Sequence, residues 1–250
     1  SQIMKLLEYS YKIKKAKSSQ NEDEDANQLL DETDTMDFLD IKDESENVAN
    51  PHWNNTTKMK VILGVSRGMA CLHDKNFIHR DLKPDNIFLD ENYNPKIGDF
   101  GTSRKVDKMN EITMTLNVGT PIYMAPELLS GETKKYSWEV DIYSFGITMY
   151  QIFVGKKADE IYTKNETRSK YRFYKSVIAG KRPIIPKNFS LQLGSIIKCC
   201  WDSCINRRPP FKRIYDYLKE EFENGEPKAF FPDIDVSEIR RYISYLDCII

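Results

Sequence analysis

Three short motifs contain the residue types that could do chemistry in this chain of 250 residues. Residues 79–86 read His-Arg-Asp-Leu-Lys-Pro-Asp-Asn, residues 99–101 read Asp-Phe-Gly, and residues 125–127 read Ala-Pro-Glu. An ionised carboxylate can accept a proton from a hydroxyl group, and carboxylate and amide oxygens are the ligands that Mg²⁺ prefers. Residues of these types suit a reaction that moves a proton beside a bound cation, provided that the fold brings the motifs together.

A long helix and a small hairpin are predicted around the first two motifs. Apolar residues recur at helical spacing after the capping candidates 54–56, which predicts one long helix over residues 56–74. The short apolar runs 86–89 and 95–97 are separated by the turn signal Asp-Glu-Asn at 90–92. This pattern predicts a β-hairpin that leads from the first motif into the second.

The second half of the chain is predicted to be mostly helical. Residues 138–153 are apolar nearly all round, which predicts a buried central helix. Further helices are expected near 168–179, 190–201 and 210–222, where prolines and glycines separate them. In the tail, residues 225–250, a helical pattern indicates either packing on the large domain or a partner-binding helix, and we favour packing.

The first fifty residues differ from the rest in composition. Between Glu22 and Glu46 there are twelve acidic residues and one basic residue, Lys42. Such blocks usually stay solvated. We therefore divide the chain into an acidic N-terminal segment, 1–50, a main domain, 51–224, and a tail helix within 225–250.

The overall composition limits the class of partner and the compartment. Lysine and arginine number 37 against 38 acidic residues, a formal charge of −1, so no net basic field attracts nucleic acid or anionic lipid. No apolar run approaches the roughly 20 residues that span a bilayer, and no signal segment opens the chain. We expect a soluble, cytoplasmic protein that binds neither nucleic acid nor membrane, and a start at Ser1 is compatible with a piece of a longer polypeptide.

The cysteines give a weaker signal. The chain has five cysteines, an odd number that is too few for a disulfide framework in a chain of this length, which fits a reducing compartment. Cys199, Cys200 and Cys204 could suggest a metal site, but no histidine is near them and no second cysteine pair lies at zinc-ribbon spacing. We favour an amphipathic helix beside Trp201 on which some of these cysteines pack inward.

Taken in order, the three motifs resemble the signature of a eukaryotic protein kinase. The resemblance covers roughly residues 56–222 and corresponds to the C-terminal lobe of that fold. Residues 119–127 and 141–146 are most similar to the tyrosine-kinase-like branch of the serine/threonine kinases. The implied fold is mainly α, a kinase-like C-lobe with a small β-hairpin, and the implied cofactors are ATP and Mg²⁺.

The resemblance assigns a role to each candidate site residue. It implies that Asp81 orients the substrate hydroxyl and accepts its proton, and that Lys83 lies near the transferred phosphate. It implies that Asn86 and Asp99 hold Mg²⁺ and that Phe88 lies beneath the adenine of ATP. The implied partner is a protein substrate in a signalling pathway.

Two positions indicate which amino acid of the substrate accepts the phosphate. Kinases specific for serine or threonine carry lysine at the position of Lys83, whereas tyrosine kinases typically have Ala-Ala-Arg or a close variant there. Thr120, before the Ala-Pro-Glu motif, agrees with this interpretation. The resemblance therefore implies a serine/threonine kinase.

The resemblance also implies a scaffold around the site. Glu127 is expected to form a buried ion pair with Arg208. Asp141 is expected to hold the backbone of the His-Arg-Asp turn, where His79 stacks with Phe100.

Regulation is implied by Arg80, which precedes Asp81. Such an arginine typically pairs with a phosphorylated activation loop, and Thr113 and Thr115 are the candidate phosphorylation sites. An upstream activating kinase is therefore an expected partner.

Parts of a complete kinase are missing from the sequence. We find neither a Gly-x-Gly-x-x-Gly loop nor the strand lysine, which typically lies about ninety residues before the catalytic aspartate. Residues 3–10 faintly resemble the fourth strand of the small lobe, which would make residues 1–50 a small-lobe remnant with the hinge and the first large-lobe helix at 28–41. An unrelated amphipathic helix is an equal alternative. With the N-terminal lobe largely absent, we expect this chain alone to be weakly active or inactive. Two interpretations stay open: the catalytic lobe of an active kinase, or an inactive kinase-like scaffold or binding module.

Overall fold

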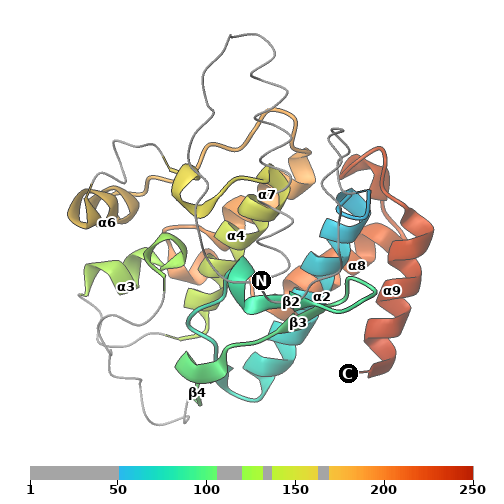
Figure 1. The fold of residues 1–250 in the computed structure, drawn as a ribbon, viewed down its shortest axis with the longest axis horizontal. Coiled ribbons are helices and arrows are strands. Elements are labelled where there is room, and N and C mark those ends of the chain that lie inside the picture. The colour runs from blue at the N-terminus through green and yellow to red at the C-terminus, as the bar shows by residue number, and fades with distance from the viewer. Residues whose placement is uncertain (1–50, 106–119, 132–136, 163–168, 250) are drawn as a thin grey trace, which may run out of the picture.

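The computed structural model describes residues 51–105, 120–131, 137–162 and 169–249. The acidic N-terminal segment, residues 3–10, and the phosphorylation candidates Thr113 and Thr115 lie outside these residues. In the described part the structure is mainly helical with two small antiparallel sheets, as predicted (Figure 1). No helix there combines the length and the apolar character needed to cross a bilayer.

The long predicted helix is α2 (Asn55–Asp74). It begins there because the Asn54 side chain accepts a hydrogen bond from the Thr57 N–H at 2.9 Å, which satisfies a donor of the first turn. One face of α2 carries fully buried apolar side chains, including Met59 and Leu63. The helix packs against β3, α8 and α9, so it links the hairpin to the C-terminal helices.

The predicted hairpin consists of β2 (Ile87–Leu89) and β3 (Pro95–Ile97), with Ile87 opposite Ile97. Its turn is closed by Asp90 Oδ1, which accepts hydrogen bonds from the N–H groups of Asn92 and Asn94, both at 2.9 Å. Asn86 lies just before β2, in a 3₁₀ turn, because its N–H bonds to the carbonyl of Lys83. A site residue thus sits at the start of the hairpin.

A second sheet was not predicted. Strand β1 (Phe77–Ile78) pairs antiparallel with β4 (Arg104–Lys105). Each strand has two residues, too short for a periodic signal in the sequence. The pairing joins the chain before the first motif to the chain after the second.

Helix α4 (Glu139–Val154) is the predicted central helix, and from Val140 onward its residues are all buried. It ends at Gly155, which has a left-handed conformation with φ of 65°. The predicted C-terminal helices are also present within a few residues of their expected ends. The remaining α-helices are α3 (Pro126–Ser130), α6 (Lys170–Ile178), α7 (Leu191–Cys200), α8 (Phe211–Glu223) and α9 (Val236–Ile249). Short 3₁₀ turns lie at Pro84–Asn86, Phe100–Thr102, Pro121–Tyr123, Ala158–Glu160, Ile205–Arg207 and Pro227–Ala229.

The tail packs on the domain, as we favoured. Helix α9 lies beside α2 and α8 at one margin of the molecule (Figure 1) and buries Ile239, Ile243 and Leu246. Lys60 Nζ lies 3.0 Å from Glu238 Oε1 and joins α2 to the start of α9. The tail is therefore part of the large-domain core.

The cysteine prediction was right for the helix and wrong for one of its members. Cys200 is fully buried on α7 and Cys199 is exposed on it. Cys204 lies beyond the end of α7, where its N–H bonds to Asp202 Oδ1 at 2.7 Å. Helix α7 ends at Cys200 because the following residues turn to bond with that carboxylate and with Arg208.

Candidate active site

The first motif is fixed by a buried carboxylate from the central helix. Asp141 is fully buried at the start of α4, and its two carboxylate oxygens accept hydrogen bonds from the N–H groups of His79 and Arg80, each at 2.8 Å. Arg80 has a φ of 68°, a conformation that costs energy in a non-glycine residue. The two hydrogen bonds to Asp141 offset that cost and hold the backbone of the turn that leads to Asp81, as the resemblance implied.

Asp81 lies nearly buried and its carboxylate is hydrogen-bonded on both oxygens. Oδ2 lies 2.9 Å from Lys83 Nζ and accepts a hydrogen bond from Asn86 Nδ2 at 3.1 Å. Oδ1 accepts hydrogen bonds from the N–H group of Thr120 at 3.0 Å and from its hydroxyl at 3.2 Å. The carboxylate is thus held in one orientation by three residues from two segments far apart in sequence.

The surroundings of Asp81 favour its charged form. Burial by itself raises the pKa of a carboxyl group, because the charged form loses hydration. Here the hydrogen bond and positive charge of Lys83 act in the opposite direction, together with the hydrogen bonds from Asn86 and Thr120. The net result is a pKa below the ordinary value of 3.8. Asp81 is therefore ionised at neutral pH.

Lys83 contacts both Asp81 and Thr120. Its ammonium group bonds to the Asp81 carboxylate and also donates a hydrogen bond to the hydroxyl of Thr120 at 2.7 Å. The side chain is mostly buried. Lys83 is therefore held beside Asp81 as a fixed positive charge.

Asn86 is oriented toward Asp81 by its amide nitrogen. Nδ2 donates to the backbone carbonyl of Asp81 at 2.7 Å and to its carboxylate, so the Asn86 amide oxygen faces away from these groups. The carbonyl of Asn86 accepts a hydrogen bond from the Gly98 N–H at 2.9 Å. The hairpin thereby brings the residue before Asp99 into direct contact with Asn86.

Asp99 follows Gly98 and is exposed. Its φ is 58° and its ψ is 65°, a left-handed conformation that is unusual for a residue with a side chain. The next residue, Phe100, contacts the ring of His79 at 5.4 Å between centroids. The contact was predicted, but the rings meet edge to face instead of stacked, and Phe100 is half-exposed. His79 Nε2 also lies 3.0 Å from the carbonyl of Gly98. The first two motifs are therefore packed against each other.

Phe88, the predicted adenine contact, lies on β2 with 48% of its surface exposed. Gly98 allows this placement, because a Cβ at that position would lie 2.5 Å from Cε2 of the Phe88 ring. The ring thus covers the strand that leads to Asp99 and presents its other side to solvent.

The third motif is fixed by the predicted ion pair. Arg208 Nη1 and Nη2 bond to the two carboxylate oxygens of Glu127 at 2.6 and 2.9 Å. Arg208 is 2% exposed, and it also donates to the carbonyls of Asp202 and Glu139. This bidentate pair fastens the start of α3 to the segment that precedes α8.

Two contacts of the site were not predicted from the sequence. His73 Nε2 lies 2.9 Å from Asp141 Oδ2, so the end of α2 joins the buried cluster around the first motif. His73 falls within the helix predicted over residues 56–74, and no partner is predicted for it. The sequence indicates only that Thr120 agrees with serine or threonine as the phosphate acceptor. Its contact with Asp81 is not predictable from the sequence, because 39 residues separate the two. Neither contact has a local sequence signal.

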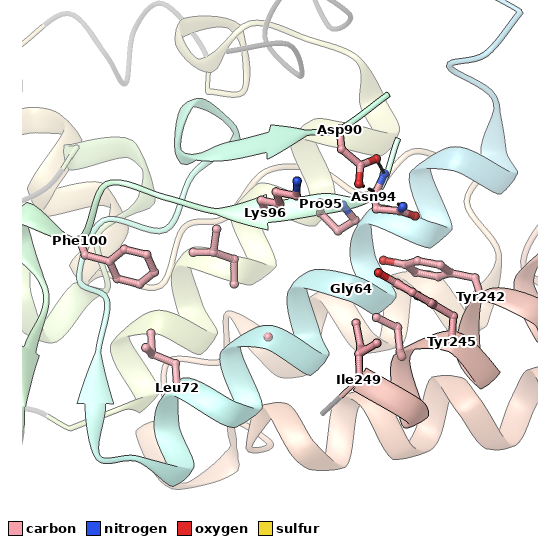
Figure 2. A pocket seen from close by; sticks show the side chains of 13 residues that line it. Gly64, Leu72, Asp90, Asn94, Pro95, Lys96, Phe100, Tyr242, Tyr245 and Ile249 are labelled. Carbon is pink, nitrogen blue, oxygen red and sulfur yellow. Dashed lines mark hydrogen bonds between the residues drawn. The ribbon is translucent and has the colours of Figure 1, made fainter. Parts of the chain in front are cut away.

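A pocket of about 340 Å³ lies beside the site, between α2, the hairpin and α9 (Figure 2). Phe100 stands at one end and Tyr242 and Tyr245 at the other. At Gly64 the wall of the pocket has no room for a side chain, because a Cβ there would lie 2.4 Å from both Pro95 Cγ and the Tyr242 hydroxyl. The pocket therefore depends on the close approach of α2, the hairpin and the tail helix.

Comparison with known proteins agrees with this geometry. The protein kinase domain family matches residues 2–218. RGS domain-containing serine/threonine-protein kinase A of Dictyostelium discoideum is 40% identical over 162 residues, which cover 65% of this chain and 13% of that protein. Serine/threonine-protein kinase STY46 of Arabidopsis thaliana is 36% identical over 176 residues, which cover 69% of this chain and 29% of that protein.

A third relative is the dual specificity protein kinase shkB of Dictyostelium discoideum, 36% identical over 153 residues, with 59% of this chain and 22% of that protein covered. The chain spans less than a third of the length of each of these three relatives. The family match covers most of the chain, so this chain belongs to the protein kinase family.

Proposed function

We propose that this chain is the large-lobe part of a serine/threonine protein kinase, which transfers the γ-phosphate of ATP to a hydroxyl group of a protein. The observation that carries the proposal is the Asp81 carboxylate, which Lys83, Asn86 and Thr120 hold in one orientation. Its lowered pKa keeps it charged at neutral pH, as a group that orients a hydroxyl and accepts its proton must be. Phosphoryl transfer needs mainly this kind of positioning and charge control.

Asn86 and Asp99 are the residues that we assign to Mg²⁺. The Asn86 amide nitrogen is used by Asp81, which leaves the amide oxygen for a cation, and the Asp99 carboxylate is exposed one residue after the Asn86–Gly98 hydrogen bond. A carboxylate and an amide oxygen fit a hard cation. When bound, Mg²⁺ would neutralise the phosphates of ATP. Lys83 would hold the transferred phosphate and Phe88 would contact the adenine.

Serine/threonine specificity is supported by the Lys83–Thr120 hydrogen bond and by the names of two relatives. A third relative is named a dual specificity kinase, so the acceptor needs a direct test. Phospho-amino-acid analysis of products from the intact protein is expected to give phosphoserine and phosphothreonine. Mainly phosphotyrosine would contradict the assignment. An upstream kinase that phosphorylates the activation loop belongs to the same proposal.

The nucleotide site can be tested on the 250-residue chain by thermal unfolding. Mg²⁺ with ATP is expected to raise the unfolding temperature, because a ligand that binds only the folded state stabilises it. EDTA or the substitution Asp99→Asn is expected to reduce this rise. Asp216→Asn, a matched change on the exposed face of α8, is expected to leave it unchanged. An equal rise in EDTA and in Asp99→Asn would contradict the metal assignment.

The alternative function is an inactive kinase-like scaffold or binding module. It is favoured by one observation, that the 250 residues contain no Gly-x-Gly-x-x-Gly loop. Without that loop and the strand lysine, the phosphates of ATP lose backbone N–H groups and a positive charge, so we expect weak or no transfer by this chain alone. Phosphotransfer measured with wild type and Asp81→Asn separates the cases. Transfer that depends on Asp81 supports the kinase, and no nucleotide binding at all supports the scaffold.

A further inference from the structure

The chain is close to neutral overall, but one stretch of it is strongly basic. Residues 169–201 contain seven basic residues and no acidic residue. They form α6, α7 and the segment between them. The basic residues are Lys170, Arg172, Lys175, Lys181, Arg182, Lys187 and Lys198. The net charge of −1 conceals this local excess of basic residues.

Helix α6 carries the basic charge on a surface that also exposes apolar side chains. Phe173 and Val177 are buried on its inner side. Tyr171, Lys175 and Ile178 follow at spacings of four and three residues, which places them together on the outer side. Tyr171 is 73% exposed and Ile178 is 44% exposed. Figure 1 shows α6 at the margin of the molecule, opposite α9.

We call Tyr171, Arg172, Lys175 and Ile178 the outer face of α6. Lys170 lies next to this face at the first residue of the helix. Among the described residues, Lys170, Arg172 and Lys175 take part in no ion pair. Their charges are therefore available to a partner.

Arg182 shows how a basic residue of the same stretch is used for structure. Its guanidinium donates hydrogen bonds to the carbonyls of Trp201 and Val177 at 2.8 and 2.9 Å and stacks on the ring of Tyr143. The Arg182 guanidinium is therefore occupied by contacts within the fold. The basic residues of the outer face have no such use.

We propose that the outer face of α6 is a docking surface for an acidic protein segment with interspersed apolar side chains. The proposal rests on the proposed function and places this segment on the protein substrate. Carboxylates would meet Lys170, Arg172 and Lys175, and apolar side chains would cover Tyr171 and Ile178. A nucleic acid would satisfy the charges and would leave Ile178 uncovered, so the surface favours a protein.

The test measures binding of a fluorescein-labelled peptide in which Asp and Glu alternate with Leu and Phe, by fluorescence anisotropy. The full chain is used, together with a variant whose acidic residues between Glu22 and Glu46 are replaced by Asn and Gln, so that this segment does not compete. Lys170→Glu with Lys175→Glu is expected to weaken binding about tenfold or more. Lys228→Glu with Arg241→Glu, an equal charge change at exposed positions before and on α9, is expected to change it less than twofold.

Two further probes complete the test. A peptide with Ser in place of Leu and Phe is expected to bind several-fold more weakly, and Tyr171→Ser is expected to remove most of that difference. No peptide binding to either chain, equal loss in both charge variants, or tighter binding of a single-stranded oligonucleotide would overturn the proposal. Peptide binding is measured without ATP. Its failure beside an intact Mg·ATP stabilisation would therefore overturn the docking surface and leave the kinase assignment in place.

Discussion

The two halves of the candidate site differ in how they are supported. In the half that we propose for the phosphate acceptor, Asp81 and Asn86 are 8% and 5% exposed. The Asp81 carboxylate accepts hydrogen bonds from Asn86 and from Thr120, which belongs to a distant segment, and the Asn86 side chain is held by Asp81. In the half that we propose for the nucleotide, Phe88 and Phe100 are 48% and 50% exposed, and Asp99 is exposed. The large domain thus builds the acceptor half from its own core. The nucleotide half is shaped by the hairpin but is covered by nothing in the described part of the chain.

This difference predicts that substitutions around the acceptor half reduce stability, whereas substitutions in the nucleotide half reduce ligand binding. The largest effect is expected for Arg208→Ala. Removal of one partner from a buried bidentate pair leaves the Glu127 carboxylate buried and unpaired, so we expect a loss of about 3 to 5 kcal/mol in the free energy of unfolding. Chemical denaturation measures it.

Lys212→Ala is the control for Arg208→Ala. Lys212 forms an exposed pair with Asp216 on α8, and its loss is expected to cost less than about 0.5 kcal/mol. Equal losses in the two variants would contradict the special role of the Glu127–Arg208 pair.

A smaller loss is expected for Gly64→Ala. The added Cβ would lie 2.4 Å from Pro95 Cγ and from the Tyr242 hydroxyl, so the hairpin or α9 must shift, at a cost of about 1 to 3 kcal/mol. In Gly68→Ala the nearest atom is the flexible end of Ile97 at 3.1 Å, and the cost should be clearly lower. If Gly68→Ala proved the more damaging variant, the packing of hairpin and tail would be misjudged.

Lys83→Met tests the electrostatics of the acceptor half. Because the folded-state pKa of Asp81 lies below 3.8, its contribution to stability is present above pH 3.8 and is lost as the pH falls through the folded-state pKa. Loss of the lysine raises that pKa, so we expect the variant to be about 1 to 2 kcal/mol less stable at neutral pH. The difference should shrink below pH 3.8. Denaturation curves between pH 7 and pH 3 measure it, and a difference that grows at acid pH would contradict this account.

Apart from the control Lys212→Ala, the smallest effect on stability is expected for Phe88→Ala. Half of the ring is already exposed, so its removal is expected to cost no more than about 1 kcal/mol. The same variant is expected to lose most of the stabilisation by Mg·ATP, because Phe88 is the proposed adenine contact. A large loss of stability with unchanged nucleotide binding would remove the contrast between the two halves.

Much of the fold was predictable because its signals are local. The capped start of α2, the turn of the hairpin and the continuous apolar stretch of α4 depend on neighbours within a few residues, and the structure confirms all three. The start of β2 was predicted one residue too early, and the placement of Cys204 on the helix was wrong. The N–H group of Asn86 bonds to the carbonyl of Lys83, which places Asn86 in a turn before β2. The N–H group of Cys204 bonds to Asp202 Oδ1, which places Cys204 in a turn after α7.

The site was predictable in part. The motifs and the resemblance predicted the contacts of Asp141 with the first motif, of His79 with Phe100, and of Glu127 with Arg208, and the structure confirms them. The magnesium, adenine and phosphate roles stay predictions. Pairings such as β1 with β4 were not predictable, because two-residue strands carry no period of their own.

The sequence by itself determined which residues could do chemistry and which segments are helical. It also determined that residues 169–201 contain seven basic residues and no acidic residue. Only the tertiary structure decided that Thr120 reaches Asp81, that His73 joins Asp141, and that Lys175 lies exposed between Tyr171 and Ile178. The physical reason is that residue type and local spacing are fixed along the chain. Burial, by contrast, and the partner of each polar group depend on segments far apart in sequence.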